Sequence, residues 1–137
     1  MARIVCVEDD DLMGSVVHDV LTAAGHQVRV AADGARALAA IAGFRPDMVV
    51  LDVGLSDESG LDLLRVLRAK PETSLLLVMM LTTARSDAVA EEAMNAGATA
   101  FMTKPFTPLE LAEAVEMVLA GEPVGDRFRG RGRSQYT

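Results

Sequence analysis

The sequence predicts an α/β fold in which a parallel β-sheet carries helices on both of its faces. The first observation is an alternation along the chain, because five short apolar runs are each followed by a longer segment with helical spacing. The second is the longest apolar run, residues 75–81, which is typical of a central strand buried on both faces. The third is that half of the 137 residues are apolar, which is enough for one domain with its own core.

Each element follows from a short pattern, taken in chain order. Strands are expected at residues 4–7, 27–30, 48–51, 75–81 and 100–102. Helices are expected at residues 13–24, 34–42, 61–68, 87–96 and 108–119. Asp33 is a candidate N-cap for the second helix. For the last helix, "TPLE" at residues 107–110 supplies a capping threonine, a proline at the first helical position and a capping-box glutamate.

Charge is distributed unevenly along the chain. Residues 1–120 contain 18 acidic and 9 basic residues and carry −9, whereas residues 121–137 contain 2 acidic residues and 4 arginines and carry +2. We expect residues 1–120 to form the folded domain, with an acidic surface that does not favour nonspecific binding to nucleic acid. Residues 121–137 lack periodicity and are rich in glycine and arginine, so we expect them to be a flexible tail.

The composition favours a cytoplasmic protein without a membrane span. No apolar run reaches the roughly 20 residues that a membrane helix needs. The N-terminal apolar run is short and leads directly into acidic residues, which is unlike a secretory signal. The single cysteine, Cys6, provides no disulfide framework, and we expect it to be a small buried hydrophobic residue.

Polar residues follow the expected strands at the points where a parallel sheet binds its ligands, beyond the carboxyl ends. They are Glu8 and Asp9 after the first strand, Asp52 after the third, Thr82 and Thr83 after the fourth, and Lys104 after the fifth. Neighbouring carboxylates repel one another unless a cation lies between them, and Mg²⁺ takes such oxygen ligands. An aspartate beside the metal can accept a phosphoryl group, whose oxygens a lysine and a threonine hydroxyl would stabilise. The sequence therefore suggests an aspartyl-phosphate site.

The run "VEDDD" at residues 7–11 contains two further acids, Asp10 and Asp11. We expect these two to lie at the start of the following helix, where acidic side chains interact favourably with the helix dipole.

Four segments, "IVCVEDD", "VVLDVGL…SG", "LTTA" and "TKPF", together resemble the receiver domain of two-component response regulators. The resemblance covers roughly residues 2–120, and the order and spacing of the four segments make it specific. It implies a CheY-like, flavodoxin-like fold: a doubly wound sheet of five parallel strands in the order 2-1-3-4-5, with five helices. It also implies that the chain is not an enzyme, apart from its own phosphorylation by a donor and slow autodephosphorylation.

The resemblance gives each polar residue at this edge a role. Asp52 would be the phosphoacceptor, Lys104 would pair with the phosphate, and the bond from Lys104 to Pro105 would be cis. Thr82 would be the switch hydroxyl, and Phe101 would be an aromatic rotamer switch. The implied magnesium ligands are Glu8, Asp9, Asp52 and the main-chain carbonyl of Gly54.

Two positions depart from the family's pattern. Ser56 stands where the family usually has proline, and Gly54 often corresponds to a larger residue. Both changes should loosen the loop after Asp52, because glycine widens the choice of backbone angles and serine lacks the constraint of the proline ring. We expect them to affect the phosphoryl lifetime and the metal affinity.

The arginines of the tail are Arg127, Arg129, Arg131 and Arg133. In an extended chain, alternate residues lie on one side, and guanidinium groups pair bidentately with phosphates and with the guanine edge. Some stand-alone receivers that are similar to this chain carry arginine-rich tails that bind cyclic di-GMP, so this nucleotide is one expected ligand. The alternatives are a disordered linker, or a segment that binds RNA or a membrane surface.

The resemblance implies a stand-alone response regulator that receives a phosphoryl group from a sensor histidine kinase or a phosphotransfer protein. Its downstream target would bind the face built from the fourth helix, fifth strand and fifth helix. We expect no DNA-binding domain, and a monomer or weak dimer.

The open alternatives are a phosphorelay intermediate and the receiver part of a longer regulator. A dehalogenase-type phosphatase is disfavoured by Gly54, where that class needs a second aspartate, and FMN binding is disfavoured because "EDDD" would repel phosphate.

Overall fold

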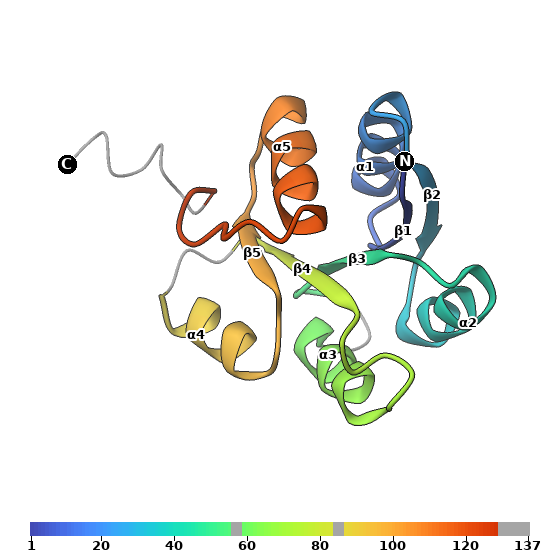
Figure 1. The fold of residues 1–137 in the computed structure, drawn as a ribbon, viewed down its shortest axis with the longest axis vertical. Helices are drawn as coiled ribbons and strands as arrows, with labels where there is room; N and C mark the ends of the chain where they lie inside the picture. Colours follow the sequence, from blue (N-terminus) through green and yellow to red (C-terminus); the bar gives the residue numbers. More distant parts are fainter. Residues whose placement is uncertain (56–58, 84–86, 129–137) are drawn as a thin grey trace.

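The structure is a computed structural model of the chain, and it describes residues 1–55, 59–83 and 87–128 (Figure 1). The strands are β1 (Arg3–Val7), β2 (Gln27–Ala31), β3 (Met48–Asp52), β4 (Leu77–Thr82) and β5 (Ala100–Thr103). The helices are α1 (Asp11–Ala23), α2 (Gly34–Phe44), α3 (Gly60–Ala69), α4 (Asp87–Asn95) and α5 (Pro108–Leu119). The predicted alternation of strands and helices is confirmed. Within the described ranges, none of the helices has the length and apolarity required to cross a bilayer.

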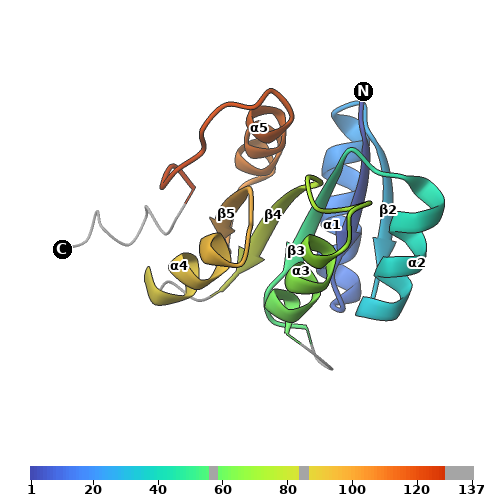
Figure 2. The same cartoon turned by 60° about the horizontal axis from the view of Figure 1, so that its bottom comes forward.

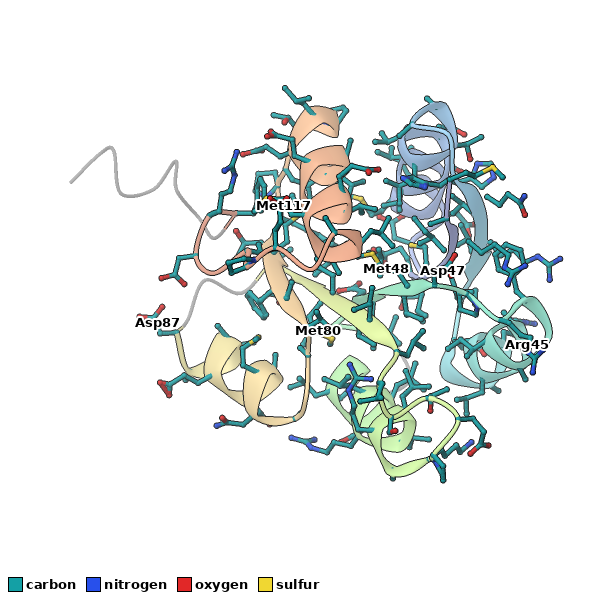
Figure 3. All side chains as sticks on the ribbon, viewed as in Figure 1. Arg45, Asp47, Met48, Met80, Asp87 and Met117 are labelled. Atoms are coloured by element: carbon teal, nitrogen blue, oxygen red, sulfur yellow. The ribbon has the colours of Figure 1, made fainter. Side chains whose placement is uncertain are left out.

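All strands of the sheet are parallel, and their order is β2-β1-β3-β4-β5, as the resemblance implied. Helices α1 and α5 cover one face, and α2, α3 and α4 cover the other (Figures 1 and 2). Each face has its own apolar layer, because successive strand residues point to opposite sides. Met48 packs in the layer with α1 and α5, and Met80 packs in the layer with α2, α3 and α4 (Figure 3).

The helix starts agree with the expected capping residues. The side chain of Asp33 accepts a hydrogen bond from the backbone N–H of Arg36 at the start of α2. Thr107 and Glu110 form the predicted capping box of α5, with Pro108 in its first turn. These caps satisfy backbone N–H groups that have no partner within the helix. They fix where the chain leaves the edge of the sheet and begins each helix.

The chain after α5 turns back toward β5 (Figure 1). The backbone N–H of Glu122 donates to the carbonyl of Met117 at 2.9 Å, and the side chains of Val124 and Phe128 are buried in the layer with α1 and α5. Over residues 121–128 this packing differs from the flexible tail that the sequence predicts, because two apolar side chains find a place in the core. Residues 129–137 lie outside the described residues.

Candidate functional site

Parallel pairing brings the predicted polar residues to one edge of the sheet. Asp52 and Thr82 are the last residues of β3 and β4, whereas Glu8 and Lys104 are the first residues after β1 and β5. Because β3 lies between β1 and β4, Asp52 ends one of the central strands. The residues therefore meet although they are far apart in the sequence.

Three carboxylates form a compact cluster at this edge. One oxygen each from Glu8, Asp9 and Asp52 lies within 4.8 Å of the others. Glu8 and Asp52 are only 3% and 7% exposed, so water cannot fully screen their charges. Burial raises the pKa of Glu8, opposed by the hydrogen bond from Lys104 and reinforced by Asp52 nearby. Burial and the neighbouring Asp52 thus oppose the ionisation of Glu8 more than its hydrogen bond with Lys104 supports it.

Lys104 supplies a cation to this cluster. Its Nζ donates to Oε1 of Glu8 at 2.8 Å and lies 3.4 Å from Oδ2 of Asp52. Burial lowers the pKa of Lys104, but the contacts with Glu8 and Asp52 outweigh burial and raise it overall. The ammonium group therefore stays protonated beside Asp52. The bond between Lys104 and Pro105 is cis, as expected.

The remaining acids of the run belong to α1. Asp10 is the N-cap, and its side chain accepts from the backbone N–H of Leu12 at 3.1 Å. Asp11 lies in the first turn. The predicted division of the acidic run is therefore confirmed, with Glu8 and Asp9 in the cluster and the next two acids at the start of the helix.

The loop after Asp52 is anchored at both ends. The backbone N–H of Gly54 donates to Oδ1 of Asp52 at 3.1 Å, and Gly54 forms an isolated backbone bridge with Ser59. Gly60, the first residue of α3, donates from its N–H to the carbonyl of Val53 at 2.8 Å. Ser56 lies outside the described residues. The carbonyl of Gly54 stays a predicted metal ligand.

Gly60 is a positioning residue that the sequence reasoning missed. A Cβ atom added to Gly60 would overlap the carbonyl oxygen of Asp52 and lie 2.9 Å from Cα of Val53. The start of α3 can therefore approach the backbone of the candidate phosphoacceptor this closely only with glycine at this position. The signal in the sequence is the pair "SG" at residues 59–60, in which Ser59 caps the helix.

The two predicted switch residues are both buried. Thr82 is 5% exposed, its backbone carbonyl accepts from the N–H of Lys104 at 2.7 Å, and it pairs across the strands with Thr103. Phe101 is 3% exposed and packs in the layer with α2, α3 and α4. Thr83 is exposed. The switching roles of Thr82 and Phe101 stay predictions.

Of the predicted tail arginines, the described residues include Arg127 alone. Its Nη2 lies 3.1 Å from Oε2 of Glu113 on α5, and both side chains are partly exposed. The other three arginines lie in residues 129–137, outside the described part. Arg127 therefore lies beside α5.

The carboxylate cluster fits a divalent cation. Glu8, Asp9 and Asp52 offer oxygen ligands, which Mg²⁺ prefers, and two of these carboxylates, Glu8 and Asp52, contact the ammonium of Lys104. A nearby lysine also fits a site that stabilises phosphoryl oxygens.

Cys6 lies on β1, two residues before Glu8. Burial and the charge of Glu8 raise the pKa of Cys6 to about 12, so this thiol stays neutral.

The sequence matches the response regulator receiver domain family over residues 4–116. It is 38% identical over 114 residues to the DNA-binding response regulator MtrA of Mycolicibacterium smegmatis, covering 82% of this chain and 48% of that protein. It is 40% identical over 106 residues to the transcriptional regulatory protein KdpE of Mycobacterium tuberculosis, covering 77% of this chain and 46% of that protein. The chain therefore spans about half the length of the curated relatives it matches.

Solved structures show the same fold over most of the chain. The chemotaxis response regulator CheY4 of Vibrio cholerae superposes with a TM-score of 0.81 at 31% identity, covering 86% of this chain and 98% of that one. A putative response regulator from Chloroflexus aurantiacus gives a TM-score of 0.82 at 35% identity, covering 87% of this chain and 98% of that one.

Proposed function

Because the chain belongs to the family of response regulator receiver domains, we propose that it is a signalling switch in which Asp52 accepts a phosphoryl group with the help of Mg²⁺. Receiver domains are switches rather than conventional enzymes, and the family implies a histidine kinase or a phosphotransfer protein as the donor. The observation that carries the proposal is the cluster of Glu8, Asp9 and Asp52, in which Glu8 and Asp52 are buried, with Lys104 beside it.

The chemistry is a phosphoryl transfer to a carboxylate. An oxygen of Asp52 forms a bond to the phosphorus, the bond from phosphorus to the donor atom breaks, and the donor leaves with the electron pair. The phosphoryl oxygens gain negative charge where Lys104 already holds a cation, and the hydroxyl of Thr82 donates to one of them. Glu8, Asp9, Asp52 and the carbonyl of Gly54 would hold a bound Mg²⁺, which would supply positive charge to neutralise the phosphoryl oxygens.

Incubation with acetyl phosphate and Mg²⁺ tests this proposal. We expect an acid-stable, base-labile adduct of one phosphoryl group, which is absent when the metal is chelated and absent from Asp52→Asn. Asp62→Asn is the matched control, because it makes the same change at an exposed position on α3 and should label normally. A labelled Asp52→Asn protein would overturn the assignment.

We also propose that the switch acts through protein contacts on the face of α4, β5 and α5, as a stand-alone response regulator. The alternative functions are a phosphorelay intermediate and the receiver part of a longer regulator, whose tail is a linker. The second alternative is favoured by one finding, since this chain spans about half of relatives that are DNA-binding or transcriptional regulators.

The tail arginines carry a further proposal, that Arg127, Arg129, Arg131 and Arg133 bind cyclic di-GMP. Alternate guanidinium groups suit the two phosphates and guanine edges of this ligand. Arg127 is available for exchange, since its partly exposed pair with Glu113 contributes at most about 1 kcal/mol.

Calorimetric titration of cyclic di-GMP tests the role of the tail. We expect binding to the full chain and loss of binding when Arg129, Arg131 and Arg133 are replaced by glutamine. Substitution is preferable to truncation, because stopping at Ala120 would uncover the core contacts of Val124 and Phe128. Arg36→Gln, an exposed arginine on α2, is the control. If the full chain does not bind cyclic di-GMP, or if the triple variant binds it equally well, the tail arginines are not a binding site for this nucleotide.

A further inference from the structure

The outer edge of β5 is covered by the chain's own C-terminal segment. In the sheet order β5 is the last strand, so one of its edges faces away from β4. At this edge the carbonyl of Phe128 accepts two hydrogen bonds from Thr103, one from its backbone N–H at 3.0 Å and one from its hydroxyl at 3.2 Å. Open strand edges are surfaces on which another segment can add. Here residues 122–128, the strap, take that place.

The strap is held mainly by apolar burial. Phe128 and Val124 are 4% and 8% exposed and join the core layer of α1 and α5. The partly exposed ion pair between Arg127 and Glu113 adds little, since such pairs are worth at most about 1 kcal/mol. Phe128 is therefore the principal anchor, through its side chain and its carbonyl together.

Two consecutive residues connect this anchor with the carboxylate cluster. Thr103 donates outward to the strap, and the next residue, Lys104, donates its backbone N–H inward to the carbonyl of Thr82. The ammonium of Lys104 contacts Glu8 and Asp52. A shift of the Lys104 backbone, as its ammonium follows a new phosphoryl group, would also move Thr103 and thus the two bonds that hold Phe128.

We propose that the strap is an intramolecular occupant of the β5 edge, and that phosphorylation of Asp52 loosens it through Lys104 and Thr103. Any partner that docks along this edge by adding an extended segment then has to replace the strap, and phosphorylation makes the replacement easier. Coupling between two sites is reciprocal, so loosening the strap also favours the phosphorylated state. The coupling rests on the proposed function, whereas docking of the strap does not.

Amide hydrogen exchange measured by NMR on the full chain tests the docking. The N–H of Thr103 reports the strap, and the N–H of Lys104, which bonds within the sheet, reports the fold. Phe128→Ala should speed exchange at Thr103 by about tenfold or more and leave Lys104 protected. Phe44→Ala, the same change on α2, should leave Thr103 unaffected. Equal protection of Thr103 in the wild type and in Phe128→Ala would overturn docking.

If Lys104 also loses protection in Phe128→Ala, the variant has lost its fold, and Thr103→Val replaces it. This substitution removes the hydroxyl bond but keeps the backbone donor and the shape of the side chain. Exchange at residue 103 should then rise by a smaller factor, and no change would overturn docking in the same way.

Beryllofluoride with Mg²⁺, a mimic of the phosphoryl group, tests the coupling. It should speed exchange at Thr103 in the wild type, and Phe128→Ala should bind it about fivefold more tightly. Unchanged exchange together with equal affinity would overturn the coupling. Failure of the wild type to bind beryllofluoride would instead count against the proposed function, and Thr103 exchange without the probe would still decide whether the strap docks.

Discussion

At the residue scale, the acidic run after β1 serves two separate purposes. Glu8 and Asp9 join Asp52 in a cluster, whereas Asp10 caps α1 and Asp11 lies in its first turn. This division could be predicted from the sequence, because the run stands between a short apolar segment and a segment with helical spacing. The first of the four consecutive acids were therefore expected at the end of the strand, and the last ones at the start of the helix.

Gly60 leads to a prediction about a single methyl group. Gly60→Ala places a Cβ atom against the carbonyl of Asp52 and forces the start of α3 away from this candidate phosphoacceptor. We expect a loss of about 1–3 kcal/mol in unfolding free energy. We also expect labelling by acetyl phosphate to slow by about tenfold or more, because small displacements of reacting groups are costly.

Gly43→Ala is the matched control for this experiment. Gly43 lies in α2, and an added Cβ there meets no atom within 4 Å, so stability should stay equal or rise slightly. Urea unfolding and the rate of labelling measure both variants. Normal labelling of Gly60→Ala would show that the close approach at Gly60 does not position Asp52.

The contacts of His26 could not be predicted from the sequence. His26 is buried, its Nδ1 accepts from the N–H of Ala2 at 3.1 Å, and its Nε2 lies 2.7 Å from Oε2 of Glu116. These partners join the start of β2 to β1 and α5. Contacts of this kind depend on how the layers pack, and local spacing in the sequence carries no signal for a pair 90 residues apart.

At the element scale, the boundaries were less predictable than the elements. The apolar run at residues 75–81 predicts a strand over its whole length, but β4 begins at Leu77 and Leu75 is 92% exposed. The turns before β4, in which Thr73 N–H donates to Lys70 and Leu76 N–H donates to Thr73, carry the chain into the sheet. Apolar character alone could not show which leucine enters the sheet.

The C-terminal segment is the element that differs most from its prediction. Its glycine and arginine content predicts a flexible tail from residue 121, yet Val124 and Phe128 are buried against α5 and β5. Two apolar residues four positions apart are a weak local signal. Their burial depends on the open edge of β5, which becomes visible only when the sheet is assembled.

The cap of α5 makes a quantitative prediction for an element. Thr107→Ala removes the side chain that accepts from the N–H of Glu110 and breaks the capping box. We expect the free energy of unfolding to fall by about 1 kcal/mol, measured by urea denaturation. Thr22→Ala, at an exposed position inside α1, is the control and should change stability little. Equal stability of wild type and Thr107→Ala would contradict a structural role for this cap.

At the scale of the whole molecule, the strand order determines the site. Residue 52 lies 44 positions after residue 8 and 52 positions before residue 104. Parallel pairing in the order β2-β1-β3-β4-β5 brings all three to one edge. The sequence could predict this meeting because parallel strands end on the same side. It could not predict the distances, the burial of Glu8 or the close approach at Gly60, which follow from packing.

The central claim is that phosphorylation occurs at Asp52, and mapping the modified residue tests it most directly. The protein is labelled with acetyl phosphate and Mg²⁺, the acyl phosphate is reduced with borohydride, and peptide mass spectrometry locates the resulting homoserine. We predict homoserine at position 52 and unmodified aspartate at positions 9, 10 and 11. Homoserine at any other position, with Asp52 unmodified, would contradict the account.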